Sequence, residues 1–227
     1  MNLDNKVVLI TGAKGGLGTF VTHAFLEAGA TVIGVSRSIK DSDFPQPRFS
    51  AAQAELASAA AARDLIAKYK RIDALVHLVG TFAGGQPVAA TDDSDFERML
   101  STNFKSALYL IQAVLPLMRE AAGGHILAIG SRAAVEPQPM IGAYAVSKAA
   151  LLNLIRTVAL ENKDKKVSAN IVLPSTMDTP VNRSAMPAAD YSKWVQPAEV
   201  ASMLVALAAS QPGQISGAVI PIYGGEL

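Results

Sequence analysis

Hydrophobic residues along this chain form short continuous runs that alternate with longer stretches of helical spacing. The runs predict buried strands at residues 6–11, 31–35, 49–54, 72–79, 125–129, 167–173 and 218–223. The stretches between them predict helices at 19–28, 56–69, 95–118, 144–161 and from Pro197 onward. Strands that alternate with helices in this way are typical of βαβ units, so we predict an α/β fold with one doubly wound parallel sheet.

The stretch from 175 to 195 shows little regular periodicity. It directly follows the strand at 167–173, at the edge where a parallel sheet binds its ligands, and we interpret it as a lid over a substrate pocket. The chain has 227 residues, 50% of them hydrophobic, with no internal repeat and no linker. We therefore predict one domain spanning 1–227.

A glycine-rich loop, Gly12-Ala-Lys-Gly-Gly-Leu-Gly18, follows the first strand and includes Lys14 and Leu17. Glycines at 12, 16 and 18 permit a tight turn, close approach of the backbone to a pyrophosphate, and close packing of helix on strand. The helix that follows offers unpaired N–H groups to phosphates. A glycine-rich surface turn is the alternative, but a strand before the loop and a helix after it favour a dinucleotide site.

Ser36 and Arg37 lie just past the end of the second strand. An acidic residue there would bind the 2′-hydroxyl of the adenosine ribose, whereas an arginine suits a 2′-phosphate. Arg37, together with Lys14, therefore predicts that NADPH is preferred over NADH. The alternative is a solvated loop arginine.

Tyr144, Lys148 and Ser131 form the candidate catalytic group. Tyr144 and Lys148 are four residues apart, so they lie one turn from each other on one face of the predicted helix. Lowering the pKa of a tyrosine from about 10 by about three units takes about 4 kcal/mol. A cation about 4 Å away supplies about that much at an effective dielectric near 20, so Tyr144 is predicted to act as a general acid. Taken alone, Tyr-x-x-x-Lys is equally typical of a packing tyrosine followed by a surface charge.

Four independent strand ends place candidate residues at the same edge of the sheet. These residues are Gly12, Arg37, Gly80 and Ser131. A serine hydrolase that pairs Ser131 with His125 is excluded, because these two residues occupy opposite ends of one strand, about 20 Å apart.

Composition excludes several other classes of function. The net charge of +1 gives no reason to expect nucleic acid or an anionic membrane surface as partner. The absence of cysteine excludes disulfides and thiol catalysis, and no cluster of metal ligands occurs. Gln211-Pro-Gly divides the uncharged stretch near the C-terminus into pieces too short for a bilayer, and the first residues do not resemble a signal peptide. We expect a cytoplasmic protein that acts on a small molecule.

Together these motifs resemble the short-chain dehydrogenase/reductase family over the whole chain. The matching residues are Thr11-Gly12-x-x-x-Gly16-x-Gly18, Asn103, Ser131, Tyr144-x-x-x-Lys148, and Pro174 with Thr179. The resemblance implies a Rossmann-like sheet of about seven strands in the order 3-2-1-4-5-6-7. It also implies NADPH-dependent hydride transfer to a small carbonyl or C=N substrate. Tyr144 would be the general acid/base, Lys148 would bind the nicotinamide ribose and lower the tyrosine pKa, Ser131 would polarise the substrate oxygen, and Asn103 would hold a water in the proton relay.

The sequence departs from the family pattern at two places. The family's Asn-Asn-Ala-Gly is His77-Leu-Val-Gly80 here, and its Pro-Gly is Pro174-Ser175. The segment 178–194 and the loop Gly80–Gly85 are similar to those of dihydropteridine reductase, with Asn182, Arg183, Met186 and Trp194 as candidate lid residues. Arg37 and Ser131 are not features of the animal enzymes of that type.

Three hypotheses about the function remain open. The first is an NADPH-dependent reductase, the second is a dihydropteridine reductase-like enzyme acting on quinonoid dihydropterin, and the third is a catalytically silent NADP-binding regulator. Helices 95–118 and 144–161 carry more apolar and small residues than one buried face needs. We expect them to form the interface of a homodimer or homotetramer.

Overall fold

The computed structural model describes residues 2–225, and all their named strands belong to one parallel sheet. The strands are β1 (Val7–Thr11), β2 (Thr31–Ser36), β3 (Phe49–Gln53), β4 (Ala74–His77), β5 (Gly124–Ile129), β6 (Val167–Pro174) and β7 (Val219–Ile222). Their order is β3-β2-β1-β4-β5-β6-β7, which confirms the prediction. The order reverses between β1 and β4, the place where open α/β sheets bind ligands.

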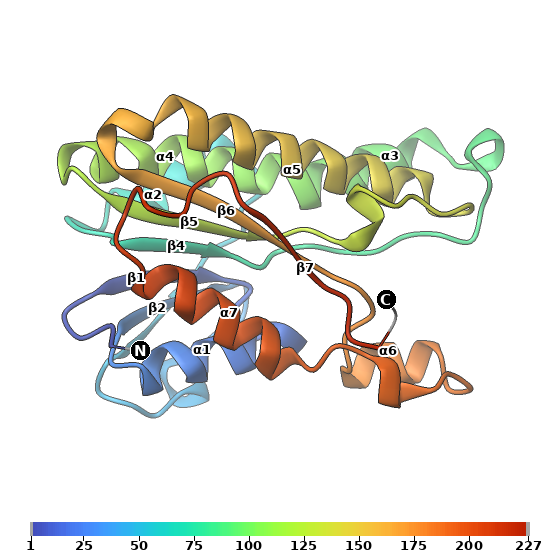
Figure 1. The fold of residues 1–227 in the computed structure, drawn as a ribbon, viewed down its shortest axis with the longest axis horizontal. Coiled ribbons are helices and arrows are strands. Elements are labelled where there is room, and N and C mark those ends of the chain that lie inside the picture. Colours follow the sequence, from blue (N-terminus) through green and yellow to red (C-terminus); the bar gives the residue numbers. More distant parts are fainter. Residues whose placement is uncertain (1, 226–227) are drawn as a thin grey trace.

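Helices cover both faces of this sheet (Figure 1). On one face α1 (Gly16–Glu27) packs against α7 (Pro197–Ala209). On the other lie α2 (Ala59–Ile66), α4 (Ser106–Glu120) and α5 (Gly142–Glu161), with α3 (Asp93–Leu100) against α5. Strands buried on both faces need apolar residues at successive positions, which is why these strands read as continuous hydrophobic runs.

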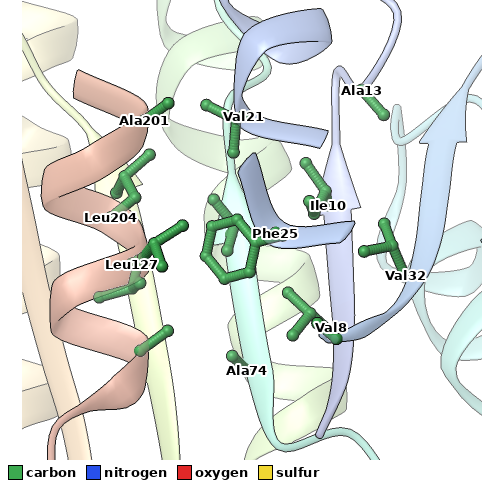
Figure 2. Close-up of a cluster of buried hydrophobic side chains, with 14 of the residues drawn as sticks. Val8, Ile10, Ala13, Val21, Phe25, Val32, Ala74, Leu127, Ala201 and Leu204 are labelled. Atoms are coloured by element: carbon green, nitrogen blue, oxygen red, sulfur yellow. The ribbon is translucent and has the colours of Figure 1, made fainter. Parts of the chain in front are cut away.

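The core beneath α1 and α7 fixes the first strand and the loop that follows it. Figure 2 shows Phe25 of α1 between Leu204 of α7 and Ile10 of β1. All three side chains are 0% exposed. Burying side chains of this size stabilises a fold by about 1.5–3 kcal/mol each. The loop after β1 is therefore attached to a rigid base.

Two helices differ from the sequence prediction in instructive ways. Helix α1 begins at Gly16 rather than at residue 19, so two glycines lie in its first turn. Glycine destabilises the interior of a helix. These two glycines lie in the first turn, where the backbone N–H groups have no intrahelical acceptor. The helix predicted at 95–118 is divided by a π turn, Ser101–Lys105, in which the Ser106 N–H donates to the carbonyl of Ser101.

The predicted lid contains more regular structure than expected. Helix α6 (Pro180–Ala185) begins there because the Thr179 hydroxyl accepts a hydrogen bond from the Asn182 N–H, with proline at the first helical position. Figure 1 shows α6 at the edge of the molecule beyond the end of β6.

Helix α5 is long and apolar enough, by composition alone, to cross a membrane, and no other helix among residues 2–225 is. Half of its most apolar window is buried inside the fold. It packs on β6 and α3 and contains the buried Lys148. These contacts are those of a core helix.

Candidate active site

The carboxyl ends of the strands gather most of the predicted site residues. A cavity of about 790 Å³ opens there, lined by the predicted residues Gly12, Lys14, Ser36, Arg37 and Gly80 and by Glu55. A cavity of about 620 Å³ at the opposite edge of the sheet contains none of them. The larger cavity therefore marks the candidate cofactor site.

The glycine loop forms the floor of this cavity. Gly12 has φ +69°, and its N–H donates to the carbonyl of Val35, which ties the loop to β2. A Cβ added at Gly18 would collide with the Gly12 carbonyl oxygen, and one at Gly15 would lie 3.1 Å from that oxygen. Leu17 is buried and anchors the first turn of α1 in the core. The bare backbone and the helix N-terminus fit the pyrophosphate of a dinucleotide.

The two predicted 2′-phosphate ligands are in different electrostatic situations. Arg37 is exposed at the cavity, and within residues 2–225 it has no ion-pair partner. Lys14 is paired with Asp43, its Nζ 2.9 Å from the carboxylate. Sequence patterns could not predict this pair, because Asp43 lies in a short 3-10 turn 29 residues further along the chain.

Tyr144 lies in the first turn of α5, where it meets Ser131 at the end of β5. A hydrogen bond with the Ser131 side chain lowers the pKa of Tyr144, but burial outweighs it and raises that pKa. The net lowering of the Tyr144 pKa that the sequence led us to expect is therefore wrong, because burial is the larger effect. The Lys148 Nζ is 6.0 Å from the centre of the tyrosine ring and donates to the carbonyl of Ile129 at 2.9 Å.

Lys148 is itself perturbed, because it is only 5% exposed. Burial lowers its pKa from 10.5 to about 8. The side chain is still mostly a cation at neutral pH. Its charge therefore lies inside the site, within one helical turn of Tyr144.

Asn103 lies in the π turn and joins three parts of the site. Its side-chain amide donates to the Ser147 hydroxyl at 2.9 Å and to the Thr81 carbonyl at 3.0 Å, while its Oδ1 accepts from the Thr81 N–H at 2.7 Å. A Cβ on Gly80 would lie 3.2 Å from both Asn103 Oδ1 and Lys148 Nζ. The interruption of the helix thus serves to hold the loop after β4 against α5.

Phe82 is a site residue that the sequence reasoning did not single out. It is 62% exposed, and its ring meets that of Tyr144 edge-to-face with centroids 5.0 Å apart. The Gly85 N–H donates to the Met140 carbonyl at 2.8 Å, which fixes the loop beside α5. The paired glycines at 84 and 85 were the signal, since a Cβ at Gly84 would lie 2.9 Å from both Ile141 and Phe82.

His77 replaces an asparagine of the family pattern and is fully satisfied. Its Nδ1 is 3.0 Å from the Thr11 hydroxyl and its Nε2 is 3.2 Å from the Ser106 hydroxyl. Ser106 donates its own proton to the carbonyl of Thr102, so Nε2 must carry the imidazole proton and Nδ1 must accept. The neutral ring joins β1, β4 and α4, and burial, aided by the Lys148 charge, lowers its pKa to about 3.

This histidine should make the protein sensitive to acid. Because the folded-state pKa is below the unfolded value of 6.5, its contribution is present above pH 6.5 and is lost as pH falls toward 3. The full loss is about 5 kcal/mol. We expect the free energy of unfolding, from urea titrations between pH 7 and about 4, to fall less steeply in His77→Asn. His23→Gln, which replaces an exposed histidine, is the matched control, and equal slopes in all three proteins would contradict the assignment.

The residues after β6 are divided between the site and the lid's own packing. Pro174 ends β6, and the buried Thr179 approaches the helix start, its Cγ2 3.4 Å from a Cβ built on Gly16. Arg183, one of the candidate lid residues, pairs with Asp178 and stacks on Tyr191. Of the other lid candidates, Asn182 donates to the Met177 carbonyl, Trp194 is 6% exposed and so packs within the fold, and Met186 is 40% exposed.

Comparison with known proteins agrees with this geometry. The family model described as short chain dehydrogenase matches residues 6–190. The 2,3-dihydro-2,3-dihydroxybenzoate dehydrogenase of Escherichia coli (strain K12) is 30% identical over 251 residues, covering 100% of this chain and 98% of that enzyme. A rhamnolipids biosynthesis 3-oxoacyl-[acyl-carrier-protein] reductase of Pseudomonas aeruginosa is 30% identical, covering 99% of this chain and 97% of that enzyme.

A solved structure extends the likeness to the whole fold. The Pseudomonas aeruginosa RhlG/NADP active-site complex superposes with a TM-score of 0.90 at 28% identity, covering 99% of this chain and 97% of that one. The family match spans most of the chain, including the glycine loop and the Ser131, Tyr144 and Lys148 positions. The chain therefore belongs to the short-chain dehydrogenase/reductase family and is an NAD(P)-dependent oxidoreductase.

Proposed function

We propose that this protein is an NADPH-dependent reductase of a small carbonyl or C=N substrate. The observation that carries the proposal is the convergence of Ser131, Tyr144 and Lys148 from β5 and α5. We assign Tyr144 as general acid, Ser131 as the group that polarises the substrate oxygen, and Lys148 as ligand of the nicotinamide ribose. Asn103 completes the site by positioning the loop after β4 and by supporting the proton relay.

Burial gives Tyr144 the protonation state that reduction requires. A nicotinamide held in this site would supply a hydride to the substrate carbon. Tyr144 donates its phenolic proton to the substrate oxygen or nitrogen, and the hydroxyl of Ser131 donates a hydrogen bond that orients that atom. The resulting phenolate is stabilised by the cation of Lys148. Since the pKa of Tyr144 is raised by burial, the acid form is fully populated at neutral pH.

The surroundings of Tyr144 favour a partly apolar, flat substrate. Phe82, Val135 and Met140 are large hydrophobic residues that are 62%, 47% and 45% exposed, and all three come from loops at the carboxyl edge. The Phe82 ring lies against Tyr144, so it supplies an exposed apolar surface beside the polar reactive centre, as is typical of a small-molecule pocket. Quinonoid dihydropterin is the second candidate substrate, favoured by the Phe82 ring that stands against Tyr144.

A screen of NADPH oxidation tests the proposal directly. Dihydropterins, quinones and β-keto thioesters are the compounds to compare, with Tyr144→Phe as the matched inactive control. Turnover of one class of compound at rates well above those of Tyr144→Phe would support the proposed reductase activity. Tight NADPH binding without turnover of any class would support the catalytically silent regulator instead.

Arg37 is the residue we assign to the NADPH preference. Charge-assisted hydrogen bonds to a 2′-phosphate contribute about 1.5–3 kcal/mol, or roughly ten- to a hundredfold in affinity. Arg37→Asp is expected to reverse the preference, since its carboxylate repels the phosphate and suits a ribose hydroxyl. Calorimetric titration with NADPH and NADH measures this. Equal affinities for the two cofactors in the unaltered protein would refute the assignment.

We further propose a cytoplasmic homodimer or homotetramer built through α4 and α5. The motivation is that α5 keeps large apolar side chains exposed, Leu160 at 78% and Val146 at 50%. Burying them against a second copy would remove this surface from water. Light scattering at micromolar concentration should give at least twice the mass of one chain. A charged residue at Leu160 should then shift the protein toward monomer, and a monomeric unaltered protein would contradict the interface.

A further inference from the structure

Asp43 is placed to control the charge at the adenosine end of the cavity. Lys14 lines this cavity, and its Nζ lies 2.9 Å from both carboxylate oxygens of Asp43. The lysine side chain is 44% exposed and the aspartate side chain 22% exposed. One of the two cations expected to face a 2′-phosphate is therefore already neutralised by the protein itself.

The aspartate is held in this position by its own loop. The Lys40 N–H donates to its Oδ2 at 2.9 Å, and the Lys14 pair together with this bond lowers the pKa of Asp43, so it is ionised at neutral pH. Ile39 and Phe44, on either side of the short turn, are 1% and 2% exposed. The carboxylate thus belongs to an anchored turn rather than to a freely moving loop.

We propose that Asp43 determines the strength of cofactor selection by neutralising Lys14, which leaves Arg37 as the dominant 2′-phosphate ligand. This inference rests on the proposed NADPH preference. A 2′-phosphate entering the cavity must compete with Asp43 for Lys14 and must also approach a fixed negative charge. Asp43 therefore lowers the affinity for 2′-phosphorylated ligands and leaves ligands with a free 2′-hydroxyl unaffected.

The test compares Asp43→Asn with the unaltered protein in calorimetric titrations of adenosine 2′,5′-bisphosphate and of AMP. Removing one charge at this range should tighten binding of the bisphosphate about three- to tenfold and leave AMP unchanged. The gain should shrink at high salt, because both charges are solvent-accessible. Asp64→Asn, an exposed aspartate on α2, makes the same change in net charge and should have no such effect.

A second pair of variants shows whether the effect passes through Lys14. Lys14→Gln alone should weaken bisphosphate binding less than Arg37→Gln, and the gain from Asp43→Asn should be smaller in the Lys14→Gln background. Weaker or unchanged bisphosphate binding in Asp43→Asn would overturn the proposal. If the unaltered protein binds bisphosphate no better than AMP, the NADPH preference itself fails, which is a distinct outcome.

Discussion

Replacing Tyr144 with phenylalanine is expected to lower kcat for reduction by about 10²–10⁴-fold, the usual contribution of a positioned general acid. The ring is retained, so its edge-to-face contact with Phe82 and its place in the first turn of α5 should be unchanged. Only the proton and the hydrogen bond with Ser131 are lost. NADPH affinity, measured by fluorescence titration, should therefore stay close to that of the unaltered protein.

Ser131→Ala provides the matched comparison for Tyr144→Phe. It removes the partner hydroxyl but leaves the acid, so a smaller loss of kcat is expected, and the double variant should be little worse than Tyr144→Phe alone. Retention of most activity in Tyr144→Phe would contradict the assigned acid. An equal loss of NADPH affinity in that variant would point to a structural role instead.

The direction of the tyrosine pKa changes the chemical picture drawn from the sequence. A tyrosine and a lysine four residues apart suggested that the cation would lower the phenol pKa toward neutrality. In the folded protein the burial of Tyr144 is the larger effect, and Lys148 directs its Nζ to the Ile129 carbonyl. Spacing along a helix predicts that two side chains share a face, but not which acceptor each one finds. Tyr144 is consequently protonated at neutral pH, which is the form that the proposed reduction requires.

Features governed by local pattern were predictable, whereas features governed by packing between distant segments were not. The glycine loop, the strand order and the gathering of strand ends follow from hydrophobic runs and from the family motifs. The π turn around Asn103 exists because its side chain bonds to Thr81, 22 residues earlier, and to Ser147, 44 residues later. The hydrophobic pattern within 95–118 does not indicate such contacts. The pairing of Lys14 with Asp43 was hidden for the same reason.

Replacing Lys148 with methionine is expected to lower kcat/KM by about 10²–10³-fold and, unlike Tyr144→Phe, to weaken NADPH binding as well. The charge of Lys148 stabilises the phenolate that forms as Tyr144 gives up its proton, and buried charge stabilisation of this kind contributes about 2.7–4 kcal/mol to a transition state. Lys148→Arg keeps the charge but not the compact ammonium geometry and should recover only part of the activity. Stopped-flow hydride transfer and cofactor titration separate the two effects.

Because the pKa of Lys148 is lowered, we expect the stability of the protein to rise in alkaline solution. Its folded-state pKa of about 8 is lower than the unfolded value of 10.5, so between these values the unfolded chain binds more protons. Stability from this group must therefore increase as pH rises from about 8 toward 10.5, by up to about 3 kcal/mol. Urea titrations across this range should show the increase in the unaltered protein and in Lys68→Met, an exposed control, but not in Lys148→Met.

Over the same range of pH the rate of reduction should fall as the cation of Lys148 is lost, so stability and activity should change in opposite directions. Parallel changes in the two quantities would show that Lys148 does not carry its charge in the working enzyme.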